Sequence, residues 1–245
     1  MKQSNLVFLK YFMLFFTLLT TNVITAQEKN IETIFVEGIP FNMVKVKGGT
    51  YTTYHSPADS VGETITVGDF YIGETEITQQ IWEAVMGENP SKHLAPYHPV
   101  ECLRYIDCEL FLMKLNHLTR HNFRMPTEAE WEYAARGGER DSITLFSGSN
   151  DIDSVAWYCN NSGNTSHDVK SKAPNGLGIY DMSGNVSEWC SQPKVPNTRS
   201  SLVGDRLMVH RGGGFLDFSN HILVTDRQEC HETVWSADVG LRIAE

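Results

Sequence analysis

The sequence lacks the closely spaced cysteine pairs that mark many zinc sites. None of its cysteines belongs to a CxxC pair. The five cysteines are Cys102, Cys108, Cys159, Cys190 and Cys230. The wide spacing of these cysteines argues against the common cysteine–histidine metal motifs. Because their number is odd, at least one thiol is left without a partner in the same chain.

Basic residues are also scarce. Lysine and arginine total 20 against 30 aspartates and glutamates, so the formal net charge is -10. An acidic domain repels phosphate backbones, and we therefore expect no nucleic-acid partner. The excess of carboxylates instead suits hard cations such as calcium.

An apolar run from Tyr11 to Val23 follows Lys2 and Lys10 and ends shortly before the small residue Ala26. This order is typical of a secretory signal peptide, which we assign to residues 1–26; the alternative is a retained N-terminal anchor. The run is too short for a comfortable membrane span. We therefore expect a periplasmic or secreted protein with no stable membrane span after cleavage. Loss of the two lysines moves the formal charge from -10 to -12.

The rest of the chain, residues 27–245, contains no internal repeat or linker and is predicted to form one domain. Alternation of apolar and polar residues predicts two short strands within residues 34–54 and another within 65–78. Helices are predicted over 79–86, where Thr78 and Gly87 flank the segment, and over 106–119. The helical spacing places one face of the second helix in the core; it comprises Cys108, Phe111, Leu112, Leu115 and Leu118.

A capping box of Thr127 and Glu130 begins a third helix, which Gly137 is expected to end. After Gly138 the helical periodicity fades, and glycine, asparagine and serine separate short apolar pieces. Helices early and irregular strands late predict an α+β fold with much ordered loop.

Seven segments in a fixed order resemble the formylglycine-generating enzyme family, also called sulfatase-modifying factor domains. They read MVKVKGGTY, FYIGETEITQQIWEAVMGENPS, HPVECLRYIDCELFLMKLN, FRMPTEAEWEYAARGG, PNGLGIYDMSGNVSEW, HRGGGF and DVGLRIA. The resemblance covers essentially everything after residue 35. It implies a variant C-type lectin fold of the formylglycine-generating enzyme type, loop-rich with short strands and a few helices.

The resemblance also implies a chemistry: oxidation of a sulfatase cysteine by oxygen on a copper(I) ion that two thiolates hold. Soft thiolates select copper(I). In the register of HRGGGF these thiolates fall near Asp217 and Ile222, and neither is cysteine. Cys230 follows too late to replace the pair, and a lone His221 is more typical of a surface residue than of a ligand. Copper is therefore not expected, and no catalytic residue is assigned. A non-haem iron triad is not recognisable either.

The stretch NGLGIYDMSGNVSEW, residues 175–189, carries the predicted metal site. By resemblance, side-chain oxygens of Asn185 and Glu188 and backbone carbonyls near Gly184 and Val186 hold a structural calcium ion. Hard oxygen donors from one tight loop suit calcium. The alternative is that Asn185 and Glu188 only form hydrogen bonds within the loop, as Asx turns do.

We therefore expect an exported, non-catalytic binding or scaffold domain with a protein or peptide partner in the cell envelope. The predicted ligand surface runs from Phe215 to Trp235 and includes Phe218 and His221, with Phe215 and Trp235 expected to pack in the core. The alternative is a formylglycine-generating oxidase with a rearranged copper site, built from Cys230 with Cys190 or Cys159. Carbohydrate binding is suggested only by the name of the fold, and the EPN and QPD tripeptides of calcium-dependent lectins do not occur.

Overall fold

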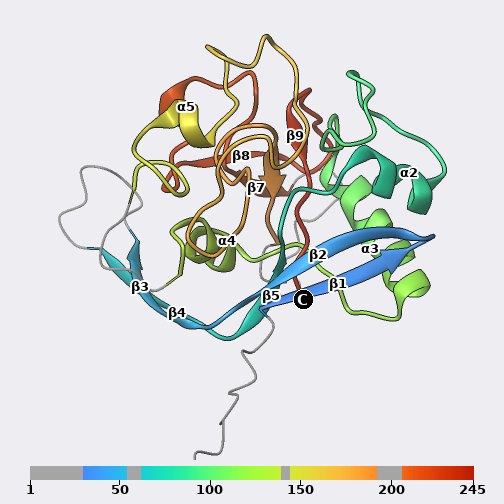
Figure 1. The fold of residues 1–245 in the computed structure, drawn as a ribbon, viewed down its shortest axis with the longest axis horizontal. Coiled ribbons are helices and arrows are strands. Elements are labelled where there is room, and N and C mark those ends of the chain that lie inside the picture. Colours follow the sequence, from blue (N-terminus) through green and yellow to red (C-terminus); the bar gives the residue numbers. More distant parts are fainter. Residues whose placement is uncertain (1–29, 54–61, 139–143, 192–205) are drawn as a thin grey trace, which may run out of the picture.

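A computed structural model describes residues 30–53, 62–138, 144–191 and 206–245. The predicted signal peptide, residues 1–26, lies outside these described residues. The ordered elements are β1 (Ile31–Val36), β2 (Ile39–Val46), β3 (Gly49–Thr53), β4 (Glu63–Val67), β5 (Phe70–Gly73), α2 (Gln79–Met86), α3 (Tyr105–Thr119), α4 (Glu128–Ala135), α5 (Ile152–Val155), β6 (Ser187–Trp189), β7 (Leu207–Arg211), η1 (Ser219–His221), β8 (Arg227–His231) and β9 (Val239–Gly240). Figure 1 shows the N-terminal strands and helices α2, α3 and α4, followed by longer stretches of loop.

The N-terminal strands form an antiparallel sheet in the order β1–β2–β5 and a separate hairpin, β3–β4. The prediction of two strands within residues 34–54 is wrong, because the turn at Glu37 and Gly38, both with positive φ, separates β1 from β2. The prediction of one strand within 65–78 is also wrong. The segment contains the end of β4 and the whole of β5, which are two separate strands. The C-terminal residue Glu245 exchanges backbone hydrogen bonds with Tyr71 and extends the first sheet, beside which the C-terminus lies (Figure 1).

The helices begin where the sequence predicts. Helix α2 starts after Thr78 and stops at Gly87, which takes the left-handed conformation with φ 83°. Helix α4 begins with the predicted capping box: Thr127 accepts from the Glu130 N–H, and the Glu130 carboxylate accepts from the Thr127 N–H. It ends at Ala135, two residues before Gly137.

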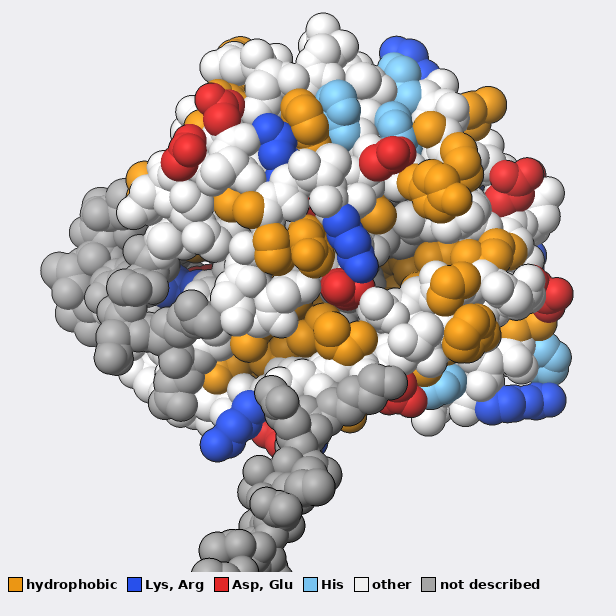
Figure 2. Space-filling model, viewed as in Figure 1, with side chains coloured by type: hydrophobic (Ala, Val, Ile, Leu, Met, Phe, Trp, Pro, Cys, Tyr) orange, Lys and Arg blue, Asp and Glu red, His pale blue; other side chains and the backbone are white. Residues whose placement is uncertain are grey.

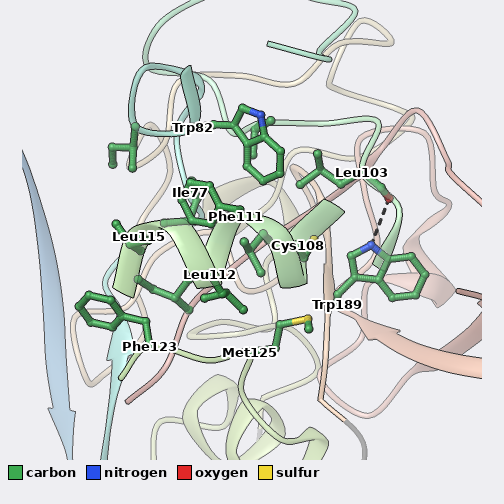
Figure 3. Packing of buried hydrophobic residues seen from close by; sticks show 14 of the residues in the cluster. Ile77, Trp82, Leu103, Cys108, Phe111, Leu112, Leu115, Phe123, Met125 and Trp189 are labelled. Atoms are coloured by element: carbon green, nitrogen blue, oxygen red, sulfur yellow. Dashed lines mark hydrogen bonds between the residues drawn. The ribbon is translucent and has the colours of Figure 1, made fainter. Parts of the chain in front are cut away.

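The first hydrophobic cluster surrounds the inner face of α3 (Figure 3). Four of the five residues predicted for this face are buried, whereas Leu118, in the last turn, is 45% exposed. Trp82 of α2 stacks on Phe111 with ring centroids 4.7 Å apart. Trp189 closes the other end of the cluster and donates its indole N–H to the Leu103 carbonyl at 3.1 Å.

The C-terminal half contributes a four-stranded sheet in the order β8–β7–β6–β9, in which β6 and β9 are parallel. Irregular segments with the short helices α5 and η1 surround this sheet, as the fading periodicity after Gly138 predicts. None of the helices in the described parts of the chain has the length and apolar composition needed to traverse a bilayer.

Candidate functional site

The loop that leads into β6 is wholly buried. Gly184 and Asn185 both have positive φ, 80° and 60°, and turn the chain sharply before the strand. Asn185, Val186 and Glu188 are each 1% exposed. The loop therefore lies inside the domain, with its polar side chains turned away from solvent.

Glu188 forms the centre of this loop's contacts. Its carboxylate accepts from the Arg242 guanidinium, with Nη2 2.8 Å from Oε1 and Nε 3.0 Å from each oxygen. The Trp131 indole N–H donates to Oε2 at 2.6 Å. Both carboxylate oxygens are thus occupied by donors that are themselves buried.

The neighbouring Asn185 and Val186 are held by Glu76. The Glu76 carboxylate accepts from Asn185 Nδ2 at 2.9 Å and from the Val186 N–H at 3.0 Å. Asn185 Oδ1 in turn accepts from the His167 N–H at 2.9 Å. The side-chain oxygens of Asn185 and Glu188 therefore all accept hydrogen bonds within the protein. Their donors lie outside the loop, whereas the alternative expected partners within it.

A calcium ion on Glu188 would have to displace Arg242 or Trp131, so the residues as placed do not fit the predicted shell. In the described parts of the chain, no group of three or more histidines, cysteines, aspartates or glutamates is arranged to hold a metal. Calcium binding by Asn185, Val186 and Glu188 stays a prediction. Thermal unfolding of the protein in calcium and in a chelator tests this prediction. Bound calcium would raise the midpoint temperature relative to the chelator, and Glu188→Gln would abolish that difference.

The structure adds three groups that the sequence analysis missed, Glu76, Asp181 and Arg242. Glu76, Asp181 and Glu188 are all buried around Arg242, whose side chain is fully buried as well. Burial, followed by the charges of Asp181 and Glu188, raises the pKa of Glu76 well above its usual range. Burial also raises the pKa of Asp181 to about 6, although its hydrogen bond from the Lys170 N–H opposes this. The Arg242 guanidinium donates hydrogen bonds to Glu188 and interacts through its charge with Glu76 and Asp181. We call these four residues the buried charge cluster.

The buried charge cluster predicts a pH dependence of stability. A carboxyl group whose pKa is higher in the folded than in the unfolded protein stabilises the fold below its unfolded pKa, and this contribution is lost as pH rises through the folded value. For Asp181 that window runs from about 4 to about 6. We expect the free energy of unfolding to fall with rising pH over this window.

The slope of the free energy of unfolding against pH should be shallower in Asp181→Asn. It should be unchanged in Glu83→Gln, a substitution of an exposed carboxylate on α2. Urea unfolding at a series of pH values measures it, and equal slopes for all three proteins would contradict the assignment.

The two positions where the family's thiolates are expected carry other chemistry. Asp217 Oδ2 accepts from the Gly214 N–H at 2.9 Å, and burial raises the pKa of this carboxyl group. Ile222 is fully buried in an apolar cluster with Phe146 and Tyr158. Neither of the two expected positions after HRGGGF therefore carries a thiol.

The five cysteines are free thiols. Cys230, on β8, packs at the edge of the first hydrophobic cluster. Cys190 lies in the second cluster and Cys159 packs against the third. The side chains that the rearranged copper site would need are therefore divided among three clusters.

The predicted ligand surface is partly exposed. Phe215 is 1% exposed, as predicted, but Trp235 is 60% exposed and the prediction that it packs in the core is wrong. Phe218 is 66% exposed. His221 is also exposed and places Nδ1 3.3 Å from Asp226 Oδ2. The loops after β7 and β8 therefore present aromatic rings to solvent.

Comparison with known proteins identifies a matching family model and several relatives. Residues 27–245 match the model of the sulfatase-modifying factor enzyme 1-like domain. A protein from Paenibacillus barcinonensis named chaperone protein LppX is 31% identical over 256 residues, which cover 82% of this chain and 88% of the relative. The formylglycine-generating enzyme of Streptomyces coelicolor is 32% identical over 151 residues, covering 49% of this chain and 46% of that enzyme.

Solved structures confirm the predicted fold class. Treponema denticola variable protein 1 superposes with a TM-score of 0.75 at 28% identity and covers 87% of this chain and 98% of its own. PvdO from Pseudomonas aeruginosa has a TM-score of 0.68 at 22% identity, over 83% of this chain and 93% of its own, and shows the fold alone.

Proposed function

This chain belongs to the family of sulfatase-modifying factor enzyme 1-like domains, and we propose that it is an exported, non-catalytic member that binds other polypeptides. The observation that carries the proposal is the pair Asp217 and Ile222, one a hydrogen-bonded carboxyl group and the other buried among apolar side chains. Copper(I) requires soft ligands, and neither side chain is one. The division of Cys159, Cys190 and Cys230 among three clusters argues against a substitute pair.

Polypeptide binding is supported by the surface and by a relative. Large contiguous apolar patches are uncommon on a protein without a partner, and the cores of interfaces are enriched in aromatic residues. Here Phe218 and Leu216 are exposed in the segment after β7, and Trp235 and Val234 in the segment after β8. The relative from Paenibacillus barcinonensis carries the name of a chaperone. Residues 1–26, as a signal peptide, would direct this activity to the periplasm or the medium.

Two measurements on the mature protein test the proposal. In the first, the reduced protein is titrated with copper(I) against a competing chelator and incubated in air with a cysteine-containing sulfatase-type peptide. We expect no tight copper binding and no loss of the peptide thiol by mass spectrometry. Stoichiometric copper binding with conversion of that thiol to an aldehyde would establish the oxidase alternative instead.

In the second, light scattering follows the aggregation of a reduced, unfolded model protein such as α-lactalbumin. We expect stoichiometric suppression by the wild type and weaker suppression by Phe218→Ser/Trp235→Ser, because the substitutions remove two exposed aromatic contacts. Phe35→Ser is the matched control, since Phe35 is 63% exposed on β1. Equal suppression by all three proteins would show that the proposed surface does not bind the client.

A further inference from the structure

Strand β1 forms an open edge of the first sheet. Among the described residues it pairs with β2 alone, whereas the opposite edge, at β5, is extended by Glu245. Its register with β2 runs residue by residue from Ile31 opposite Val44 to Val36 opposite Ile39, without a bulge. The side of β1 that faces away from β2 is therefore a straight, regular strand edge.

The backbone hydrogen bonds show which residues of β1 face outward. The Lys45 N–H donates to the Asn30 carbonyl at 2.8 Å, and the Glu74 N–H donates to the Asn42 carbonyl at 2.9 Å. In an antiparallel pair the residues that bond the neighbouring strand alternate with residues that point away from it. The outward backbone groups of β1 are therefore those of Ile31, Thr33 and Phe35. No element in the described parts of the chain pairs with them.

Strand β1 lacks the features that usually keep sheet edges apart. Natural edges are protected by lysine, proline, bulges or short length. The sequence of β1 is IETIFV, which contains neither lysine nor proline. The edge strand β8 of the four-stranded sheet differs, since it exposes the charged or polar side chains of Arg227, Glu229 and His231. An unprotected, regular edge favours pairing with another strand.

Phe35 places an exposed aromatic ring on this edge. The side chain is 63% exposed and lies on the same face of the sheet as the side chain of Ile31. Ile31, at the other end of the strand, is half-buried and packs against the second hydrophobic cluster. Figure 2 shows hydrophobic side chains exposed in the part of the surface where Figure 1 places β1 and β2. A strand that covered the edge would bury the Phe35 ring.

The sequence of β1 is complementary to itself. In an antiparallel pair centred on Thr33, all three outward residues of each copy are paired, with Ile31 opposite Phe35 of the second copy and Thr33 opposite Thr33. Aromatic–β-branched pairs and threonine pairs are among the cross-strand pairs that stabilise sheets. Glu32, the charged residue of the strand, lies opposite Ile34 and not opposite another carboxylate.

We propose that two copies of this chain associate through β1, so that their three-stranded sheets join into one sheet of six strands. An unrelated strand would use the same backbone groups, but the symmetric order of Ile31, Thr33 and Phe35 supplies matched side-chain pairs only to a second copy. The inference goes beyond the proposed function and does not depend on it.

Analytical ultracentrifugation of the mature protein over a range of concentrations tests the inference. We expect a reversible equilibrium between monomer and dimer. Thr33→Pro removes the outward N–H at the centre of the pair but no backbone hydrogen bond to β2, and proline is tolerated on edge strands in this orientation. It should weaken the dimer by about tenfold or more, because each dimer loses two hydrogen bonds. Thr33→Val is the matched control: it also removes the hydroxyl group but keeps the N–H, and it should retain the dimer.

A second pair of substitutions tests the register. Ile31→Lys and Phe35→Glu should each weaken the dimer, because each places a charge opposite an apolar side chain. The double variant places lysine opposite glutamate at both ends of the pair and should recover part of the lost affinity. Damage to the fold of the monomer would not produce this recovery.

A wild-type protein that is monomeric at every concentration would overturn the inference, as would a dimer that Thr33→Pro leaves unchanged. If the wild type is monomeric and Thr33→Pro weakens the suppression of aggregation, the edge binds a client strand and not a second copy. Phe35→Ser should lose the dimer and still suppress aggregation as the wild type does. Failure of the dimer and failure of the polypeptide-binding function are therefore observed separately.

Discussion

Arg242→Met is expected to destabilise the protein by about 3–5 kcal/mol, the usual cost of removing one partner of a buried ion pair. Arg242 is 0% exposed and donates to Glu188, to the Gly73 carbonyl at 2.8 Å and to the Tyr180 carbonyl at 2.7 Å. Methionine fills a similar volume but donates no hydrogen bond. It would leave the buried charge cluster with three carboxyl groups and no cation.

Urea unfolding measures this effect, and Arg227→Met is its matched control. The Arg227 side chain is 40% exposed and pairs with Glu128 and Glu229 at the surface. Exposed ion pairs contribute about 0–1 kcal/mol, so the control should change the free energy of unfolding by no more than that. A loss for Arg242→Met as small as the control's would show that the buried pair adds little.

A double-mutant cycle with Glu188→Gln identifies the cause of the loss. Glutamine keeps an acceptor for the Trp131 indole but removes the negative charge. If the uncompensated charge of Glu188 is what destabilises Arg242→Met, then Glu188→Gln should cost less in that background than in the wild type. Equal costs in the two backgrounds would point to the lost carbonyl contacts at Gly73 and Tyr180 instead.

The sequence predicts local features well because their physical causes are local. The capping box of Thr127 and Glu130 spans four residues, and both hydrogen bonds form as predicted. The turn at Glu37 was missed because Glu37 is a non-glycine residue in the left-handed region. Such residues are uncommon, and a glutamate at this position does not indicate a turn. The exposure of Trp235 was missed for another reason: a single aromatic residue in an irregular segment has no periodicity that assigns it to a face.

The buried charge cluster could not be predicted from any local pattern. Its members come from the segment between β5 and α2, the loop before β6, β6 itself and the C-terminal segment after β9. Only the folded chain brings Glu76 and Arg242 to the same place. The family resemblance drew attention to Asn185 and Glu188; the structure makes Glu188 a member of this cluster and Asn185 a hydrogen-bond donor to Glu76. It did not reveal that protein donors occupy their oxygens.

Gly184→Ala is the second substitution for which we expect a large effect, a destabilisation of about 2–5 kcal/mol. Two costs add at this position. The left-handed φ of 80° costs an L-residue about 1–2 kcal/mol. An added Cβ would also lie 2.2 Å from the Trp157 carbonyl oxygen, and crowding in a packed interior typically costs a further 1–3 kcal/mol, occasionally more.

The contact at Gly184 cannot relax cheaply, because the obstructing atom belongs to the backbone. The Trp157 carbonyl also accepts from the Asn185 N–H at 2.8 Å, so moving it breaks a hydrogen bond of the same loop. Displacement of the loop would then shift Glu188 relative to Arg242. The substitution should therefore weaken the buried charge cluster as well as the turn.

Gly178→Ala separates the two costs. Gly178 has the same φ of 80°, but nothing lies within 4 Å of the position that its Cβ would take. It should lose only the conformational part, about 1–2 kcal/mol. Urea unfolding of the two variants beside the wild type gives the difference directly. If both lose the same amount, the close approach of Trp157 to Gly184 has no energetic consequence, and the glycine is required for its φ alone.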